Sequence, residues 1–195
     1  MNASAATPVL PRTQSALLRN TLAVVLGSLF VAICAHLSFP LPYTPVPFTL
    51  QPFAVLLLGL ILSPGVAAGA LALYLAEGAL GLPVFTPHGP GGMLQLLGPT
   101  GGYLLSYPFV AFLTSWLHRR FTASAFISAL LAAAAGDAII LSSGAAWLAV
   151  LQPHTLVAIL TLSVLPFLPG EVLKVIAAAG LATGFRRLRS RILPS

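Results

Sequence analysis

The sequence predicts an all-α polytopic membrane protein with six transmembrane helices, in which Pro/Gly-rich external loops lie over a ligand cavity. Of its 195 residues, 58% are hydrophobic and 6% are charged, and the mean hydropathy is +1.00. Soluble domains carry about 25% charged residues, so this composition excludes an ordinary soluble enzyme. Proline- and glycine-rich segments separate the apolar stretches, and one apolar stretch holds a carboxylate and a lysine three residues apart.

The apolar stretches give the positions of the six helices. We expect these helices at about residues 19–37, 50–62, 64–80, 102–117, 123–141 and 170–185. The first is close to the roughly 20 residues that span a bilayer core. Glycine-containing turns at Ser142–Gly144 and Pro169–Gly170 are expected to break the helical pattern, so that Gly170 begins the last helix. Residues 145–165 should be apolar and partly helical, with an interruption at Gln152 and Pro153.

Basic residues indicate the orientation in the membrane. They lie before the first helix, after the fourth helix and at the C-terminus, at positions Arg12, Arg19, Arg119, Arg120, Arg186, Arg187, Arg189 and Arg191. With six spans these groups fall on one side, and an excess of Lys and Arg marks the cytoplasmic side. The pI of about 10.5 is therefore read as a topology signal and not as evidence of nucleic-acid binding.

This orientation divides the chain into three parts in a cell membrane, with both termini cytoplasmic. We expect a cytoplasmic N-terminal tail at residues 1–18, a six-helix membrane domain at 19–185 and a basic cytoplasmic tail at 186–195. A cleaved signal peptide has a similar order of residues. We prefer a retained first helix because no A-x-A cleavage site follows the apolar run.

Two opposite charges lie in the segment FLPGEVLK, at the start of the last predicted helix. Glu171 and Lys174 share one helix face because they are three residues apart. An ionisable side chain at a bilayer centre costs about 2.5 to 3.5 kcal/mol on insertion scales, so such groups usually pair or meet a ligand. We expect this face to point inward. The alternative is a self-neutralising structural pair.

Other polar residues of the predicted helices have two readings each. Thr49 and Gln51 are either ligand contacts or ordinary residues of a helix start. Tyr74 and Glu77 either line the cavity or lie at the membrane interface, and we favour the interface for Glu77. Asp137 is either a cavity group or a buried neutral acid.

Two long loops are expected on the external side. Residues 39–52 contain five prolines and should form a stiff, partly extended loop that covers a cavity. Residues 83–102 are rich in glycine and proline and too apolar for disorder, so they should be an ordered loop or a re-entrant segment. The chain has no G-x-x-x-x-G-K-[ST] sequence, so it is not expected to be its own ATPase.

Small residues recur at i, i+4 spacing in the first predicted helix. The pairs are Ala23 with Gly27, and Ser28 with Ala32. Such pairs allow another helix to approach closely. They suit an intramembrane partner, although the spacing is also common by chance.

Four segments together resemble one known family. They are VPFTLQPF (46–53), LYLAEGALGLPVF (73–85), LLGPTGGYLLSYP (96–108) and PFLPGEVLK (166–174). This set, in this order, resembles BioY, the biotin-specific substrate-binding (S) component of energy-coupling-factor (ECF) transporters. The resemblance implies a six-helix protein that takes up biotin from outside, with no catalytic role and no cofactor. It also implies a transmembrane coupling subunit (EcfT/BioN type) with two cytoplasmic ATPases.

The resemblance also implies roles for individual residues. Glu171 and Lys174 would hold the ureido ring of biotin, whose N–H groups and carbonyl match a carboxylate and an ammonium. Apolar walls for the ring system and chain of biotin would come from Phe48, Tyr74 and Tyr103, and Thr49 and Gln51 are the candidate polar contacts. The carboxylate of biotin would meet His88 or backbone N–H groups near Gly98. The pairs formed by Ala23, Gly27, Ser28 and Ala32 would contact the coupling subunit.

Three other functions remain as alternatives. One is an S component for a different vitamin. Another is an intramembrane enzyme that uses Glu171 or Asp137 as a general base, although the chain has no H-E-x-x-H or G-x-S-x-G motif. The third is a structural membrane partner, which predicts no saturable binding of a small molecule.

Overall fold

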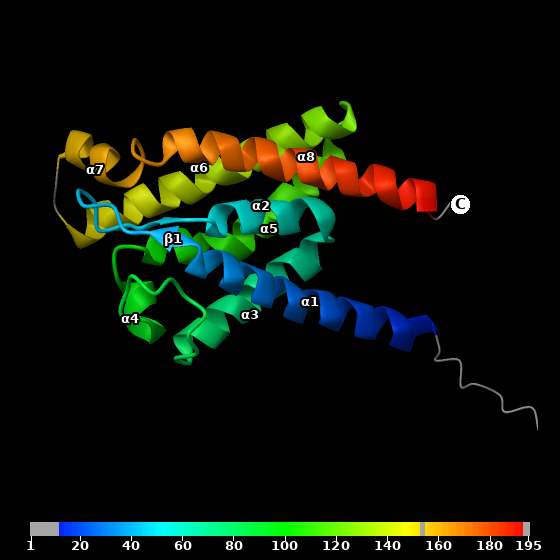
Figure 1. Ribbon diagram of the computed structural model, residues 1–195, viewed down its shortest axis with the longest axis horizontal. Coiled ribbons are helices and arrows are strands. Elements are labelled where there is room, and N and C mark those ends of the chain that lie inside the picture. The colour runs from blue at the N-terminus through cyan, green and yellow to red at the C-terminus, as the bar shows by residue number, and fades with distance from the viewer. Residues whose placement is uncertain (1–11, 153–154, 193–195) are drawn as a thin grey trace, which may run out of the picture.

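The computed structural model describes residues 12–152 and 155–192, which form eight helices and one small sheet (Figure 1). The helices in chain order are α1 (Arg12–His36), α2 (Gln51–Ile61), α3 (Pro64–Ala79), α4 (Gly92–Leu97), α5 (Gly101–Arg120), α6 (Ala125–Leu151), α7 (Leu156–Ser163) and α8 (Leu168–Ile192). Strands β1 (Ser38–Phe39) and β2 (Phe48–Thr49) pair antiparallel, with Ser38 opposite Thr49. The expected partly extended loop between the first two helices is therefore present.

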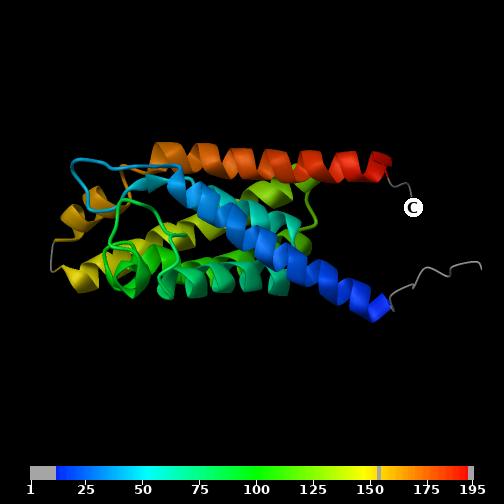
Figure 2. The same ribbon diagram turned by 60° about the horizontal axis from the view of Figure 1, so that its bottom comes forward.

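The loops and the helix termini separate to opposite ends of the bundle. Figures 1 and 2 show β1, α4 and α7 at one end, and the beginning of α1 and the end of α8 at the other. Three described segments are long and apolar enough to cross a membrane: Gln14–His36, Ala125–Leu151 and Leu168–Leu188. Helix α2 has 11 residues, or about 16 Å at 1.5 Å per residue, which is shorter than a bilayer core of about 30 Å.

The six predicted helices correspond to α1, α2, α3, α5, α6 and α8, but the two terminal ones are longer than expected. Helix α1 begins at Arg12 instead of residue 19, and α8 continues to Ile192 instead of residue 185. Charge does not end a helix, whereas proline does, and the nearest prolines outside these helices are Pro11 and Pro194. Residues 12–18 and 186–192 of the predicted tails are therefore helix, and residues 1–11 and 193–195 lie outside the described residues.

The predicted break at Ser142–Gly144 is wrong, because α6 runs without interruption through these residues. Ser142 Oγ donates to the Ala138 carbonyl, 2.7 Å away, so its hydroxyl is satisfied within the helix. A Cβ at Gly144 would lie 2.0 Å from Cζ of Tyr103 on α5. Glycine is therefore required here for close helix packing and not for a turn.

Helix starts agree with the residues that precede them. Pro64 begins α3, where a missing N–H costs nothing. Ser124 and Thr155 accept backbone N–H groups at the starts of α6 and α7. Helix α8 starts at Leu168, two residues before the predicted Gly170, because proline is tolerated in a first helical turn.

Helix α5 lies in the middle of the bundle and contacts α2, α3 and α6. A Cβ at Gly102 would lie 2.2 Å from Cβ of Trp147, which allows α5 and α6 to pack closely. On the other side of the molecule, a Cβ at Gly27 would lie 2.9 Å from Cβ of Ala70, where α1 crosses α3. The tight α5–α6 contact places the start of α5 against the loop-bearing end, where the site lies.

Candidate functional site

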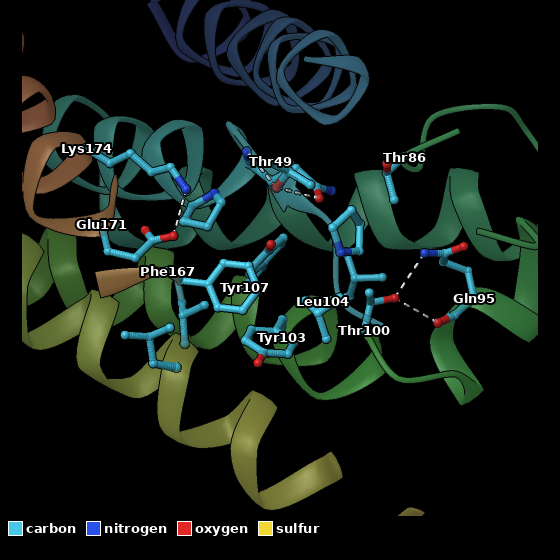
Figure 3. Close-up of a pocket in the computed structure, with 16 residues that line it drawn as sticks. Thr49, Thr86, Gln95, Thr100, Tyr103, Leu104, Tyr107, Phe167, Glu171 and Lys174 are labelled. Carbon is cyan, nitrogen blue, oxygen red and sulfur yellow. Dashed lines mark hydrogen bonds and ion pairs between the residues drawn. The ribbon is translucent and has the colours of Figure 1, made fainter. Parts of the chain in front are cut away.

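A cavity lies at the loop-bearing end, between the β1–β2 segment, α2, α5, α6 and α8 (Figure 3). Its walls are mainly apolar, formed by Val46, Pro47, Pro52, Leu104, Ile140, Leu141 and Phe167. Polar side chains converge on it from five parts of the chain: Thr49, Gln51, Thr86, Gln95, Thr100, Tyr103, Tyr107, Glu171 and Lys174. Apolar walls with a few placed polar groups are typical of small-molecule sites.

Glu171 and Lys174 form a buried ion pair at one end of this cavity (Figure 3). Lys174 Nζ lies 2.6 Å from Glu171 Oε1, and the two residues are 6% and 4% exposed. Glu171 Oε2 has no hydrogen-bond partner among the described residues. The predicted inward-facing pair is present, and it keeps one free acceptor oxygen.

The first and the last of the four family-like segments, VPFTLQPF and PFLPGEVLK, meet at this pair. The ring centroid of Phe48 lies 4.1 Å from Lys174 Nζ, close enough for a cation–π contact. A Cβ at Gly170 would lie 2.3 Å from Cζ of Phe48, so only glycine lets the ring approach α8 here. Phe48 does not line the cavity, but it holds the lysine in place.

A short hydrogen-bonded chain runs along the neighbouring wall. Thr49 Oγ1 donates to Gln51 Oε1 over 3.2 Å, and Gln51 Nε2 donates to Tyr74 Oη over 2.5 Å. Thr49 and Gln51 line the cavity, whereas Tyr74 lies behind them and is fully buried. Tyr74 therefore orients Gln51 and does not reach the cavity itself.

Two tyrosines of α5 complete the wall near α7. Tyr103 Oη donates to the Ser163 carbonyl over 2.6 Å, which ties α5 to α7. Tyr107, one turn further along α5, also lines the cavity and is 2% exposed. Tyr103 is thus at the cavity, as the sequence predicted, and Tyr107 is an addition.

A second polar group lies at the opposite end of the cavity, as Figure 3 shows for Thr86, Gln95 and Thr100. Gln95 Nε2 donates to Thr100 Oγ1 over 3.0 Å, and its Oε1 accepts from the Gly91 N–H over 3.3 Å. Thr86 Oγ1 donates to Ser38 Oγ over 3.0 Å. The cavity therefore has two polar ends separated by apolar walls.

A side-chain hydrogen bond connects the loop over the cavity to α7. Thr44 Oγ1 donates to the Leu162 carbonyl over 2.5 Å, which joins the β1–β2 segment to α7. The cavity encloses about 510 Å³ including its opening to solvent, but the centre of a water molecule can occupy only about 40 Å³ of it. This is room for roughly three waters at 10 to 15 Å³ each. A larger ligand therefore requires side chains or loops around the cavity to move.

Some predicted site residues lie elsewhere. His88 is exposed and outside the cavity lining, with Nε2 3.3 Å from the Ser38 carbonyl oxygen. Gly27, Ser28 and Ala32 are buried inside this chain, and Gly27 packs on Ala70 of α3. These three are not free to contact a second subunit unless α1 leaves α3, and Ala23 is half-buried.

The two remaining acids occupy different positions. Glu77 on α3 is half-buried and accepts a hydrogen bond from the Ser28 hydroxyl of α1, away from the cavity lining. Asp137 on α6 is 7% exposed and lies beside Glu171 without lining the cavity. Neither of them is a direct cavity group.

The sequence interpretation missed four polar lining residues: Thr86, Gln95, Thr100 and Tyr107. Tyr107 could have been found, because it lies four residues after Tyr103 and so on the same helix face. Gln95 is the one polar residue of the apolar segment MLQLL, which is also a usable signal. The positions of Thr86 and Thr100 at the cavity depend on how the long loop folds back, and no periodic pattern in the sequence predicts that fold.

This arrangement offers groups that can bind a small molecule. It offers an acceptor oxygen on Glu171 and donors on Lys174 at one end, and amide and hydroxyl donors at the other. Among residues 12–152 and 155–192, no group of three or more His, Cys, Asp or Glu side chains is placed to hold a metal ion. The site is suited to a ligand with polar groups at both ends and an apolar middle.

Comparisons with known proteins identify relatives of the whole chain. The chain is 34% identical to "Biotin transporter BioY" of Thermotoga maritima over 158 residues, covering 81% of this chain and 90% of that protein. It is 42% identical to "Probable biotin transporter BioY" of Pyrococcus horikoshii over 91 residues, which are 46% of this chain and 56% of that protein.

A solved structure has the same fold. It is described as the "S-component for biotin from an ECF-type ABC transporter", and it superposes with a TM-score of 0.81 at 27% sequence identity. The match covers 92% of this chain and 95% of that one. The profile of the BioY family matches residues 5–191. The chain is therefore a member of the BioY family.

Proposed function

We propose that this chain binds biotin and acts as the substrate-specific component of an ECF-type vitamin transporter in the cell membrane. The observation that carries the proposal is the buried Glu171–Lys174 pair, which lines a cavity and keeps Glu171 Oε2 free. A pair with a purely structural role needs no adjoining cavity. Relatives named as biotin transporters give the ligand its identity.

The ureido ring of biotin fits the charged end of the cavity. A ureido group has two N–H donors and one carbonyl acceptor. Glu171 Oε2 accepts one N–H, and Lys174, which has three donors and uses one on Glu171, donates to the carbonyl. Thr49 and Gln51 lie on the adjacent wall and offer further polar contacts. The bicyclic ring would lie between Tyr103, Tyr107 and the apolar walls.

The carboxylate of biotin fits the other polar end. The Gln95 amide has a second N–H that can donate to the ligand there, Thr86 and Thr100 lie beside it, and no acidic residue lines that end. His88 is exposed outside the cavity, so we place the carboxylate at Gln95 instead. The tail of biotin would cross the apolar middle between the two ends.

The finer topology is also part of the proposal. Six spans would be formed by α1, α2, α3, α5, α6 and α8, with the short α2 and α3 supported by the helices around them. The ends of α1 and α8 lie opposite the loop-bearing end in Figures 1 and 2. Arg119 and Arg120 end α5, and the basic side faces the cytoplasm by the positive-inside rule. Biotin would then enter from outside through the loops.

Energy for uptake would come from other subunits. The chain has no phosphate-binding loop sequence, so a transmembrane coupling subunit of the EcfT/BioN type with two cytoplasmic ATPases is the expected partner. Membership of a family of transporter components agrees with the expectation that the chain is not an enzyme. No cofactor is required for binding of this kind.

Equilibrium binding of labelled biotin to the detergent-purified full-length chain tests the proposal. We expect saturable binding at one site per chain, displaced by unlabelled biotin but not by thiamine or riboflavin. Failure of displacement by biotin, or equal displacement by another vitamin, would reject biotin as the ligand. Absence of any saturable binding would favour a structural role.

A further inference from the structure

Two carboxyl groups meet next to the cavity, one on Asp137 of α6 and the other on Glu171 of α8. They are 7% and 4% exposed. Helices α6 and α8 pack against each other, and the charges of Glu171 and Lys174 both act on Asp137. Glu171 lines the cavity and Asp137 does not. Asp137 therefore lies beside Glu171 without forming part of the cavity lining.

A proton between these groups would supply the donor that their buried oxygens lack. Asp137 Oδ1 and Glu171 Oε2 are buried oxygens with no donor among the described residues. Glu171 Oε1 is occupied by Lys174 Nζ at 2.6 Å. Ionised carboxylates only accept hydrogen bonds, so two of them can bond to each other only if one carries a proton.

The charges around Asp137 lead to the same requirement. The elements packed against α6 are α2, α5, α7 and α8. Helices α2 and α7 contain no titratable residue, α5 presents Tyr107, and α8 presents Glu171 and Lys174. Two ionised acids with one lysine would leave a net negative charge in an apolar region, which is costly. One retained proton makes the group neutral.

We propose that Asp137 retains a proton and donates it in a hydrogen bond to Glu171, which keeps Glu171 ionised and oriented toward the ligand. Asp137 is then a positioning residue of the binding site. Its effect on biotin affinity rests on the proposed function, whereas the presence of the proton does not. With the proton on Asp137, the negative charge stays on Glu171, where it faces the N–H groups of a ureido ring.

Infrared spectroscopy can detect this proton directly. The whole chain has three acidic side chains, so few carboxyl bands overlap. We expect the purified protein at neutral pH to show the carbonyl stretch of one protonated carboxylic acid. The band should disappear in Asp137→Asn and persist in the matched variant Glu77→Gln. Absence of the band in the parent protein, or its loss in Glu77→Gln alone, would overturn the proposal.

Biotin binding gives a second, independent test. Asparagine keeps an N–H donor toward Glu171, so Asp137→Asn should retain affinity within about threefold of the parent protein. Asp137→Ala removes the donor and should weaken binding roughly tenfold or more. Equal loss in both variants would mean that an ionised Asp137 is needed, and would overturn the proposal. If the parent protein does not bind biotin, the proposed function fails. The infrared result still decides whether Asp137 carries a proton.

Discussion

Glu77 on α3 and Glu171 on α8 both lie in apolar helices, but their surroundings differ. Glu77 meets the hydroxyl of Ser28 where α1 crosses α3, at a contact formed by small residues and outside the lining of the cavity. Glu171 meets Lys174 and Asp137 at the wall of a cavity. An acid in an apolar helix is thus not by itself a sign of a ligand site. A charged pair with a free oxygen next to open space is the stronger sign.

The strongest test of this contrast between Glu77 and Glu171 is to remove Lys174. Lys174→Met keeps most of the side-chain volume but leaves Glu171 buried without its cation. Removing one partner of a buried charged contact costs about 2 to 5 kcal/mol, which is roughly 30-fold or more in Kd. We expect biotin binding to be lost or weakened by at least this factor in equilibrium binding of labelled ligand.

The control for this prediction is a change of similar size on the same helix but away from the cavity. Leu173→Met alters a residue that is 69% exposed and next to Lys174 in sequence. Its affinity should equal that of the parent protein. Unchanged binding in Lys174→Met would remove the lysine from the site and with it the distinction between the two acids.

Glu171→Gln is expected to have the next largest effect. Glutamine keeps an acceptor oxygen but loses the charge, and it leaves the Lys174 ammonium without its partner. We expect a loss of about tenfold to 100-fold in affinity, since a hydrogen bond to a charged group contributes about 1.5 to 3 kcal/mol. The double variant Glu171→Gln, Lys174→Met should lose less than the sum of the two single changes, because neither charge is left unpaired. Additive losses would show that the two residues act separately.

The contrast between the two acids also shows what the sequence can predict. The positions of six helices follow from apolar runs, and the pairing of Glu171 with Lys174 follows from their spacing on one helix face. These are local properties of a few neighbouring residues. They can be predicted from the sequence because they do not depend on residues that are distant along the chain.

Features that depend on a distant partner could not be predicted in this way. Gly144 resembles a helix breaker until Tyr103 of α5 is placed against it. Gly27 and Ser28 resemble a surface for another subunit until α3 supplies Ala70 and Glu77 as their neighbours. In each case the same small residue suits a turn, an internal contact or an external one, and only tertiary packing decides.

The far end of the cavity gives a smaller predicted effect. Gln95→Leu removes an amide donor from the place where we put the carboxylate of biotin, and it should weaken binding roughly tenfold, or about 1.4 kcal/mol. Gln95→Glu should weaken it more by placing a like charge there. Both losses should shrink when binding is measured with biotinamide, whose tail is neutral. Equal losses for biotin and biotinamide would place the carboxylate elsewhere.

The smallest effect on biotin binding is expected at Glu77 and its partner Ser28. Glu77→Gln keeps a group that can accept from Ser28, and Ser28→Ala removes the hydroxyl from the α1–α3 contact. Neither should change biotin affinity by more than about twofold, because neither residue lines the cavity. Ser28→Ala should instead lower stability by about 1 to 3 kcal/mol, since it leaves a half-buried carboxyl group without its donor. Thermal unfolding in detergent measures this loss. A tenfold loss of affinity in Glu77→Gln without loss of stability would mean that the α1–α3 contact belongs to the binding site, and the two acids would then share one role.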